Sequence, residues 1–462
     1  MRERSPGFKL MLAGLVGLAL LIPLLMVYGL VSDRQQQARI AEQTISAGSG
    51  GAQVLSGPIL VVPYKEERTT TETVNGKSVS RTANLRGELY LSPVTHTLET
   101  ALEPERKKKA LYETVIYLAR MEGSARFEVP QDTARFGIKP ASLLLGEAQI
   151  RFGTSDPRGL RAAADVRVGG QAIALHPGDG PRTSGGAGFS GMVDWSDGKP
   201  LQVDYRYTIR GSRSLTLVPR GGQTDWKVTS PWRHPGFGGS FLPDNSAISD
   251  DGFTASWSIG NIALGQALVT AEDLDAPVIV DQTDPMSYVM AEAVESGGTK
   301  TASIRLVEPG DIYAQVDRSV KYGFLFIGFT FVAFLLFDVI GGARVAAAEY
   351  LLTGAGLVLF FVLLLAFAEW TGFALAYVIA SAAIIGLLTA YSAAVLGGWK
   401  RAAFVGGMLT ALYAVLYILL SLEAASLLIG AILMFAALAG VMFATRNIDW
   451  SAVASSPDPS AE

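Results

Sequence analysis

The sequence contains no cysteine and only three histidines among its 462 residues. The absence of cysteine excludes disulfides, so any exported part of the chain must be held together by its own hydrophobic core. The histidines, His96, His176 and His234, are far apart in the sequence, and none has a second ligand at the spacing of a metal-binding helix. No P-loop, HExxH or G-x-S-x-G motif occurs. We therefore expect no metal, no other cofactor and no catalytic residue.

Charged residues are also scarce, at 17% of the sequence against about 25% in an ordinary soluble domain. Residues 10–31 form an uncharged apolar run that is long enough to cross a bilayer as a helix, and residues 322–444 carry charges only at wide intervals. Residues 32–318 between them have the composition of a soluble domain. The net charge of −4 and the pI of about 5.6 argue against a nucleic-acid partner.

These apolar segments predict a membrane protein with six spans. We interpret residues 1–31 as a cytoplasmic N-terminus and an uncleaved signal-anchor helix, because the apolar run is long for a signal peptide and no clear A-x-A cleavage site follows it. Residues 32–319 are expected to form an exported domain, residues 320–446 a bundle of five transmembrane helices, and residues 447–462 a partly disordered cytoplasmic tail. The five helices are expected at about 321–340, 350–368, 373–396, 402–421 and 425–444.

The basic residues of the short connections set the orientation. The connections on one side of the spans carry Arg2, Arg4, Lys9, Arg344, Lys400, Arg401 and Arg446, whereas the short connections on the other side carry Glu369 and Glu423. By the positive-inside rule, the basic side is cytoplasmic. Both termini are therefore predicted in the cytoplasm, and the large domain on the opposite side of the membrane.

The exported domain has the pattern of a β-rich fold. Runs rich in β-branched and aromatic residues are bounded by Gly, Pro or Asp, and Asn75-Gly76 is a strong hairpin signal. The first helix is expected to continue through DRQQQARIAEQTIS and to end at the GSGG of residues 48–51. We interpret the charged run ERKKK (105–109) as a solvated turn between strands. The domain is predicted to be mostly antiparallel, either as one β unit or as two packed together.

Two stretches of this domain invite a functional interpretation. GAGFSG (186–191) matches the dinucleotide pattern G-x-G-x-x-G, but it lies in a Gly-rich loop between strands, so we do not interpret it as a nucleotide site. PWRHPGFGGSFLP (231–243) is rich in proline, glycine and aromatic residues, and its prolines are expected to preclude a regular ladder. We interpret it as a structural corner, with a recognition loop as the alternative. Its candidate residues are Trp232, His234, Pro235, Phe237, Gly239 and Phe241.

Ionisable residues in the predicted spans are few and lie near span ends. Asp338 is the deepest, Arg344 could pair with it, and Glu349 begins the third span. We interpret them as interface charges, with an ion pathway as the alternative. In the fourth span, small residues recur every four positions, at Ala382, Gly386, Ala390, Ala394 and Gly398. Such a stripe permits close helix approach, either inside the bundle or in a homo-oligomer.

Several stretches carry a family resemblance in order along the chain. They are LSGPILVVPY (55–64), SLTLVPRGGQTDWKVTSPWRHPGFGGSFLPD (214–244), VEPGDIYAQVDRSVKYGFLFIGFTFVAFLLFD (307–338), EYLLTGAGLVLFFVLLLAFAEWTGFALAYVIAS (349–381) and TRNIDW (445–450). The sequence thereby resembles the CreD inner-membrane proteins, also called cell-envelope-integrity proteins, of Gram-negative bacteria. That family commonly has a His-Pro pair and a Gln before the third span, where this chain reads ARVAAAEY. A mechanism that requires that histidine is therefore not expected here.

The resemblance implies a bacterial inner-membrane protein with a periplasmic domain, linked to a two-component sensor system, to envelope integrity and to the β-lactam response. The expected fold is an α+β membrane protein with a signal-anchor helix, a large mostly antiparallel β domain and a C-terminal bundle of five transmembrane helices. The expected function is non-enzymatic: the periplasmic domain binds an envelope protein or cell-wall component, and the helices anchor it in the lipid bilayer. A transporter or channel formed by the C-terminal bundle is the alternative, and an enzyme acting on cell-wall material or lipid is a third possibility.

Overall fold

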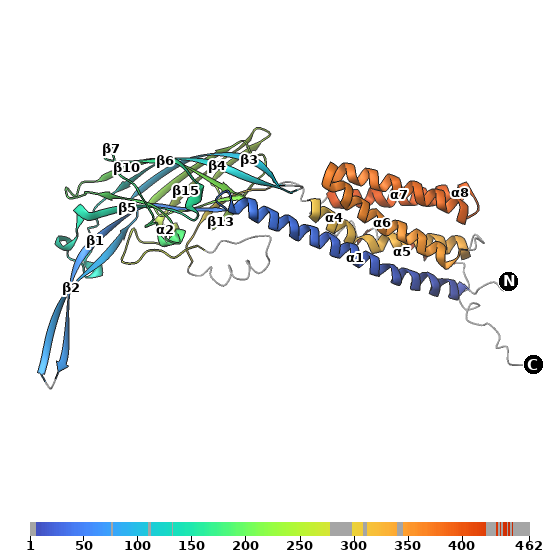
Figure 1. The fold of residues 1–462 in the computed structure, drawn as a ribbon, viewed down its shortest axis with the longest axis horizontal. Coiled ribbons are helices and arrows are strands. Elements are labelled where there is room, and N and C mark those ends of the chain that lie inside the picture. Colours follow the sequence, from blue (N-terminus) through green and yellow to red (C-terminus); the bar gives the residue numbers. More distant parts are fainter. Residues whose placement is uncertain are drawn as a thin grey trace, which may run out of the picture. The chain divides into compact units, whose positions relative to one another are not determined.

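A computed structural model of the chain describes residues 6–74, 77–109, 112–131, 133–277, 298–307, 312–339 and 345–421, together with 431–432, 435, 438–440, 442–443 and 446. The chain divides into two compact units. One is Ile40–Pro309, which contains the sheets; the other combines Met1–Arg39 with Gly310–Glu462 and contains the apolar helices (Figure 1).

Helix α1 (Pro6–Ala47) is 42 residues long and belongs to both units. Its first part is the apolar run with Pro23 inside it, and its last part is the polar sequence that follows. The helix ends at a glycine-rich turn in which the backbone N–H of Gly51 donates to the carbonyl oxygen of Ser46 at 2.8 Å. The predicted continuation of the first helix beyond the apolar run is therefore confirmed.

The β unit consists of two sheets. The nine-stranded sheet has the spatial order β13 (Pro235–Gly239), β17 (Ala302–Leu306), β11 (Ser214–Val218), β1 (Gln53–Val74), β5 (Ala148–Thr154), β9 (Gly188–Val193) and β8 (His176–Pro177). In addition, β2 (Lys77–Leu91) pairs with β1, and β16 (Val269–Thr270) pairs with β2. The eight-stranded sheet has the order β14 (Asn245–Ser249), β15 (Gly252–Gly260), β12 (Gln223–Ser230), β3 (Thr95–Lys109), β4 (Tyr112–Phe127), β10 (Leu201–Ser212), β6 (Leu160–Val168) and β7 (Gln171–Ala172).

Most neighbouring strands are antiparallel, as the sequence predicted, and the parallel pairs are β1 with β11 and β3 with β12. Within the described residues, the connections contain the short helix α2 (Asn261–Leu264) and the 3-10 helices η1 (Ala134–Phe136), η2 (Pro140–Ser142), η3 (Leu145–Glu147), η4 (Pro157–Gly159) and η5 (Arg182–Ser184). The sequence left open whether the domain is one β unit or two. The structure shows one compact unit made of two sheets.

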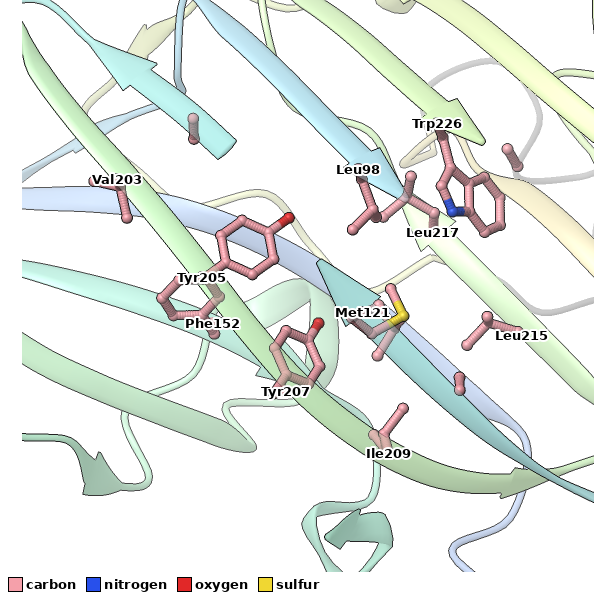
Figure 2. Packing of buried hydrophobic residues seen from close by; sticks show 14 of the residues in the cluster. Leu98, Met121, Phe152, Val203, Tyr205, Tyr207, Ile209, Leu215, Leu217 and Trp226 are labelled. Carbon is pink, nitrogen blue, oxygen red and sulfur yellow. The ribbon is translucent and has the colours of Figure 1, made fainter. Parts of the chain in front are cut away.

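A single hydrophobic core takes side chains from both sheets (Figure 2). Alternating residues of β10, namely Val203, Tyr205, Tyr207 and Ile209, point into it, as the period of two along a strand requires. Its largest members include fully buried tryptophans, among them Trp226, whose ring stacks on Trp257 with 4.6 Å between centroids. Aromatic side chains of this size each bury about 150–250 Å² and contribute strongly to the stability of a core.

Two hairpins extend the sheets. The β1–β2 ladder continues to Val74 opposite Lys77, which confirms the predicted hairpin, although Asn75 and Gly76 lie outside the described residues. The β3–β4 ladder likewise continues to Lys109 opposite Tyr112. The charged run 105–109 is therefore the end of strand β3, and its interpretation as a turn was wrong. Backbone hydrogen bonds between two strands need no apolar side chains, so the charged residues remain solvated on a regular ladder.

The helical unit contains α4 (Ile312–Lys321), α5 (Gly323–Val339), α6 (Ala347–Thr371), α7 (Phe373–Val395) and α8 (Trp399–Ser421) besides the first part of α1. Among the described residues, five helices are long and apolar enough to cross a membrane: α1, the joined α4 and α5, α6, α7 and α8. The last predicted span, 425–444, falls mostly outside the described residues. The structure thus shows an N-terminal apolar helix and four further ones around a buried apolar core.

Candidate functional site

The segment 231–243 does not form an irregular corner throughout. Pro235–Gly239 is strand β13, which pairs with β17 from Pro235 opposite Leu306 to Gly239 opposite Ala302. The expectation that its prolines preclude a regular ladder was wrong for Pro235, whereas Pro231 and Pro243 lie outside the strands. β13 is the edge strand of its sheet, and a proline at the start of an edge strand removes no hydrogen bond that the ladder needs.

Trp232 is held just before this strand by its indole. Its Nε1 donates to the carbonyl oxygens of His234 and Val307, each at 3.1 Å, and the Arg106 guanidinium lies 5.7 Å from the ring centroid. The carbonyl of His234 also accepts the backbone N–H of Val307 at 3.1 Å, whereas the imidazole is exposed. The main chain of His234, rather than its side chain, therefore holds this part of the segment.

The rest of the segment packs onto the core. The Phe237 ring lies edge-on to Trp257 with 5.9 Å between centroids, and the indole Nε1 of Trp257 donates to the carbonyl oxygen of Phe241 at 3.2 Å. Gly239 has φ of +88°, and a Cβ there would lie 2.5 Å from the carbonyl oxygen of Thr301. These contacts hold Phe237, Gly239 and Phe241 against the sheet, and position 239 requires glycine.

A shallow groove of about 470 Å³ opens beside this segment on the eight-stranded sheet. One wall belongs to β14, which pairs only with β15 among the described residues and is exposed along its whole length. Ile248 on β14 is 55% exposed and Leu242 just before it is 66% exposed. The groove is lined by Ala101, Leu102, Glu103, Thr229, Ser230, Pro231, Ala247, Ser249, Asp251, Gly252, Phe253 and Thr254. An exposed edge strand next to a groove can bind an extended peptide.

A buried ion pair that the sequence did not indicate lies elsewhere in the β unit. Arg220 Nη1 donates to Asp273 Oδ1 at 2.6 Å, and the other carboxylate oxygen of Asp273 accepts the backbone N–H of Arg182 at 2.7 Å. Burial lowers the pKa of Arg220, and the Asp273 carboxylate opposes that effect. The Arg182 side chain pairs with the exposed Asp275 at 2.6 Å. These residues come from three separate segments, so no local sequence pattern signals their contact.

His96 is a core residue. Its Nε2 lies 2.6 Å from the hydroxyl of Tyr205, and it is 2% exposed. Burial lowers the pKa of His96 to about 4 and raises that of Tyr205, so the imidazole is neutral near pH 7. His176 lies exposed on β8 opposite Ser190. Within the described residues, no group of three or more His, Asp or Glu side chains is placed to hold a metal ion.

The GAGFSG stretch leads into strand β9, which begins at Gly188. The dinucleotide motif requires a helix after its glycines, and here a strand follows them instead. Its partner β5 pairs with it from Gly153 opposite Gly188. The stretch therefore belongs to the sheet rather than to a phosphate-binding turn.

Two ionisable residues that the sequence singled out in the helical unit, Asp338 and Glu349, lie near helix ends. Asp338 is 3% exposed at the end of α5, and Arg344 lies outside the described residues. The Glu349 carboxylate accepts the backbone N–H of Ala346 at 2.7 Å, which satisfies the start of α6 and favours its dipole. On α7, the small residues Ala382, Gly386, Ala390 and Ala394 are exposed. The buried face of α7 is instead formed by Ala376, Tyr377, Ala380, Ile384, Leu388 and Ser392.

The fold and these sites define a multi-pass membrane protein with a large two-sheet β unit between its first and second apolar helices. The chain belongs to the CreD family: the model described as Inner membrane protein CreD matches residues 5–451. Inner membrane protein CreD of Escherichia coli (strain K12) is 30% identical over 442 residues, covering 94% of this chain and 91% of that protein. The family match and the apolar helices place the chain in a lipid bilayer, as a multi-pass inner-membrane protein.

One solved structure with partial similarity is a mutant M1 zinc metallopeptidase from Deinococcus radiodurans bound to a Tyr-Ser-Ala substrate. The match covers 49% of this chain and 52% of that one at 6% identity, with a TM-score of 0.20. A score this low carries no argument about fold or function.

Proposed function

We propose that the protein is a non-enzymatic, membrane-anchored binding protein that supports cell-envelope integrity. In this proposal both termini lie in the cytoplasm and the β unit lies in the periplasm, where it binds another envelope protein or cell-wall component. The observation that carries the proposal is the groove beside β14, about 470 Å³ in volume, next to a strand whose outer edge pairs with no described residue. Free backbone N–H and C=O groups at such an edge favour an extended polypeptide as the ligand.

Site-specific photo-crosslinking in cells tests this proposal. A photoreactive residue is placed at Ala247, in the groove wall, and at Ala172, which is exposed on β7 at the opposite edge of the same sheet. We expect an envelope protein or cell-wall product from position 247 and not from position 172, and Thr254→Glu, which changes an exposed residue of the groove opposite Ala247, should reduce its yield. Identical products from both positions, or no product from position 247, would contradict the proposal.

A second candidate function is transport through the helical unit, which one observation favours. Thr330 and Asp338 lie two turns apart on one face of α5, and Tyr350 and Thr353 lie on the buried face of α6. The two faces meet, since the rings of Phe334 and Tyr350 have centroids 6.1 Å apart. Buried polar groups inside a bundle are typical of substrate or ion pathways. The test measures ion or substrate flux into proteoliposomes that contain the protein. Flux in the wild type that is lost in Asp338→Asn would support this function, and absence of flux in the wild type would exclude it.

A further inference from the structure

We propose that a basic patch on the β unit binds the anionic headgroups of the bilayer in which the protein is anchored. The patch consists of Arg106, Lys107 and Lys108 at the end of β3, together with Trp232 and Arg233. Its four cationic side chains are exposed, and the Arg106 guanidinium lies 5.7 Å from the centroid of the Trp232 ring. Two sequence motifs that are far apart along the chain, ERKKK and PWRHP, are thus brought together at one hairpin: Arg106 and Lys108 lie on the face of β3 that contacts Trp232, and Lys107 lies on the opposite face.

The charges of the patch favour an anionic partner. Arg106 pairs with Glu113 at 3.7 Å, with both side chains largely exposed, and Glu105 adds a second carboxylate. The cations therefore outnumber the anions by two. Trp232 is only partly buried, and tryptophan beside Lys and Arg is the combination that membrane interfaces favour. Clustered basic residues next to a membrane segment are typical of binding to acidic lipids.

The last turns of helix α1, which belong to the β unit, lie beside the hairpin that carries part of the patch. The carbonyl of Gly51 accepts the backbone N–H of Ser212 at 2.7 Å, while Glu42, earlier in the chain, pairs with Arg213 at 3.1 Å and accepts the Thr114 hydroxyl at 3.5 Å. On the β4–β10 ladder, Ser212 lies opposite Ile116. Going from Ile116 to Thr114 along β4 therefore runs alongside the chain from Gly51 back to Glu42, within the β unit, and β4 begins two residues before Thr114, at Tyr112.

The distances along the chain bring the patch within reach of the headgroups. Glu42 is eleven residues after Val31, which is the end of the apolar run, and this corresponds to about 16 Å of helix. Thr114 lies opposite Lys107, and the hairpin continues for two more residue pairs, to Tyr112 opposite Lys109. The hairpin therefore extends about 7 Å past Thr114. The interfacial layer is about 5–8 Å thick, and long Lys and Arg side chains reach further still.

A second covalent link leads to the same surface. Trp232 and His234 both hydrogen-bond to the main chain of Val307, and Val307 is five residues before Ile312, where α4 begins. Five residues span at most about 17 Å. The joined helices α4 and α5 form an apolar helix that is long enough to cross the membrane. The patch is therefore tethered near the bilayer by the chain on both sides of the β unit.

The absence of cysteine makes a site-specific test direct. Glu105→Cys introduces a unique thiol at an exposed position beside the patch, which is labelled with a fluorophore in the full-length protein. The labelled protein is reconstituted in nanodiscs of phosphatidylcholine alone, or with about one third phosphatidylglycerol, each with a trace of headgroup-nitroxide lipid as quencher. We expect stronger quenching with phosphatidylglycerol, and loss of that difference at high salt, because salt screens exposed charges.

Charge variants assign the effect to the patch. The triple change Arg106→Glu, Lys107→Glu and Lys108→Glu should abolish the difference between the two lipid compositions, since each cation near an anionic surface strengthens binding about fivefold. Neutralisation of the same three residues to Gln should give an intermediate result, and circular dichroism verifies that each variant is folded. The matched control reverses Lys139, Arg161 and Lys199, which are also exposed; it should leave quenching unchanged.

Equal quenching in both lipid compositions would overturn the proposal. An anionic-lipid effect that survives the triple reversal would also overturn it, because the effect would then arise elsewhere on the protein. If lipid composition has no effect but the reversal removes a crosslink to an envelope protein, the patch binds protein and the proposal fails.

Discussion

Arg220 Nη1 lies 2.6 Å from Asp273 Oδ1, and the two side chains are only 3% and 2% exposed. Asp273 also accepts the backbone N–H groups of Arg182 and Leu274, at 2.7 and 2.8 Å. One carboxylate therefore joins the segment after β11, the start of η5 and the segment after β16. A buried carboxylate that accepts several hydrogen bonds recovers much of the solvation it loses on folding.

Removal of this carboxylate should strongly destabilise the β unit. Asp273→Ala leaves the Arg220 guanidinium buried without its counter-charge, and we expect a loss of about 3–5 kcal/mol in the free energy of unfolding. The matched control is Asp275→Ala, which removes an 81% exposed partner of Arg182 and should cost at most about 1 kcal/mol. Denaturation of the full-length protein in detergent, followed by tryptophan fluorescence, measures both. Similar losses for the two variants would contradict the assigned role of the buried pair.

Some of this architecture could be predicted from the sequence because it depends on local patterns. Uncharged runs indicated the apolar helices, and alternating β-branched residues indicated the mostly antiparallel β unit. The Arg220–Asp273 pair could not be predicted, because the two residues are 53 positions apart. Their contact depends on the order of the strands, which brings the segments after β11 and β16 together. The strand at Pro235–Gly239 was missed for a related reason: only the sheet order shows that it is an edge strand, where proline is tolerated.

The buried imidazole of His96 should make the β unit less stable in acid. Burial lowers its pKa to about 4 from an ordinary value of 6.5, so the unfolded chain binds a proton in this range that the folded chain does not. The contribution of His96 to stability is therefore complete above about pH 6.5 and decreases as the pH falls, by about 3 kcal/mol at pH 4. Unfolding free energies measured across this range provide the test.

His96→Gln separates this effect from the titration of carboxylates. Glutamine can still hydrogen-bond to the Tyr205 hydroxyl but does not titrate, whereas every Asp and Glu is common to both proteins. The variant should lose less stability than the wild type between pH 6.5 and pH 4. Parallel pH profiles for the two proteins would show that His96 is not responsible.

Tyr205 also lies directly opposite Gly123 on the β4–β10 ladder, and its ring covers the glycine. A Cβ at position 123 would collide with the ring and lie 2.9 Å from the carbonyl oxygen of Thr97. Gly123→Ala should therefore destabilise the β unit by about 1–3 kcal/mol, because the buried ring must move within a packed core. Gly238→Ala on edge strand β13 is the control: its Cβ would meet only the Ser303 hydroxyl, at 3.1 Å. Thermal unfolding followed by circular dichroism should show a clearly larger loss for Gly123→Ala.

Trp232 and His234 are expected to respond differently to substitution. The indole of Trp232 donates to two carbonyl oxygens, so Trp232→Phe, which retains an aromatic ring but removes the donor, should cost about 1 kcal/mol. The imidazole of His234 is exposed and only its backbone holds Val307, so His234→Ala should change stability by less than about 0.5 kcal/mol. Denaturant midpoints of the two variants measure this difference. A marked loss of stability in His234→Ala would mean that the imidazole itself supports the segment. Normal stability with loss of the crosslink from position 247 would instead make His234 part of the binding surface.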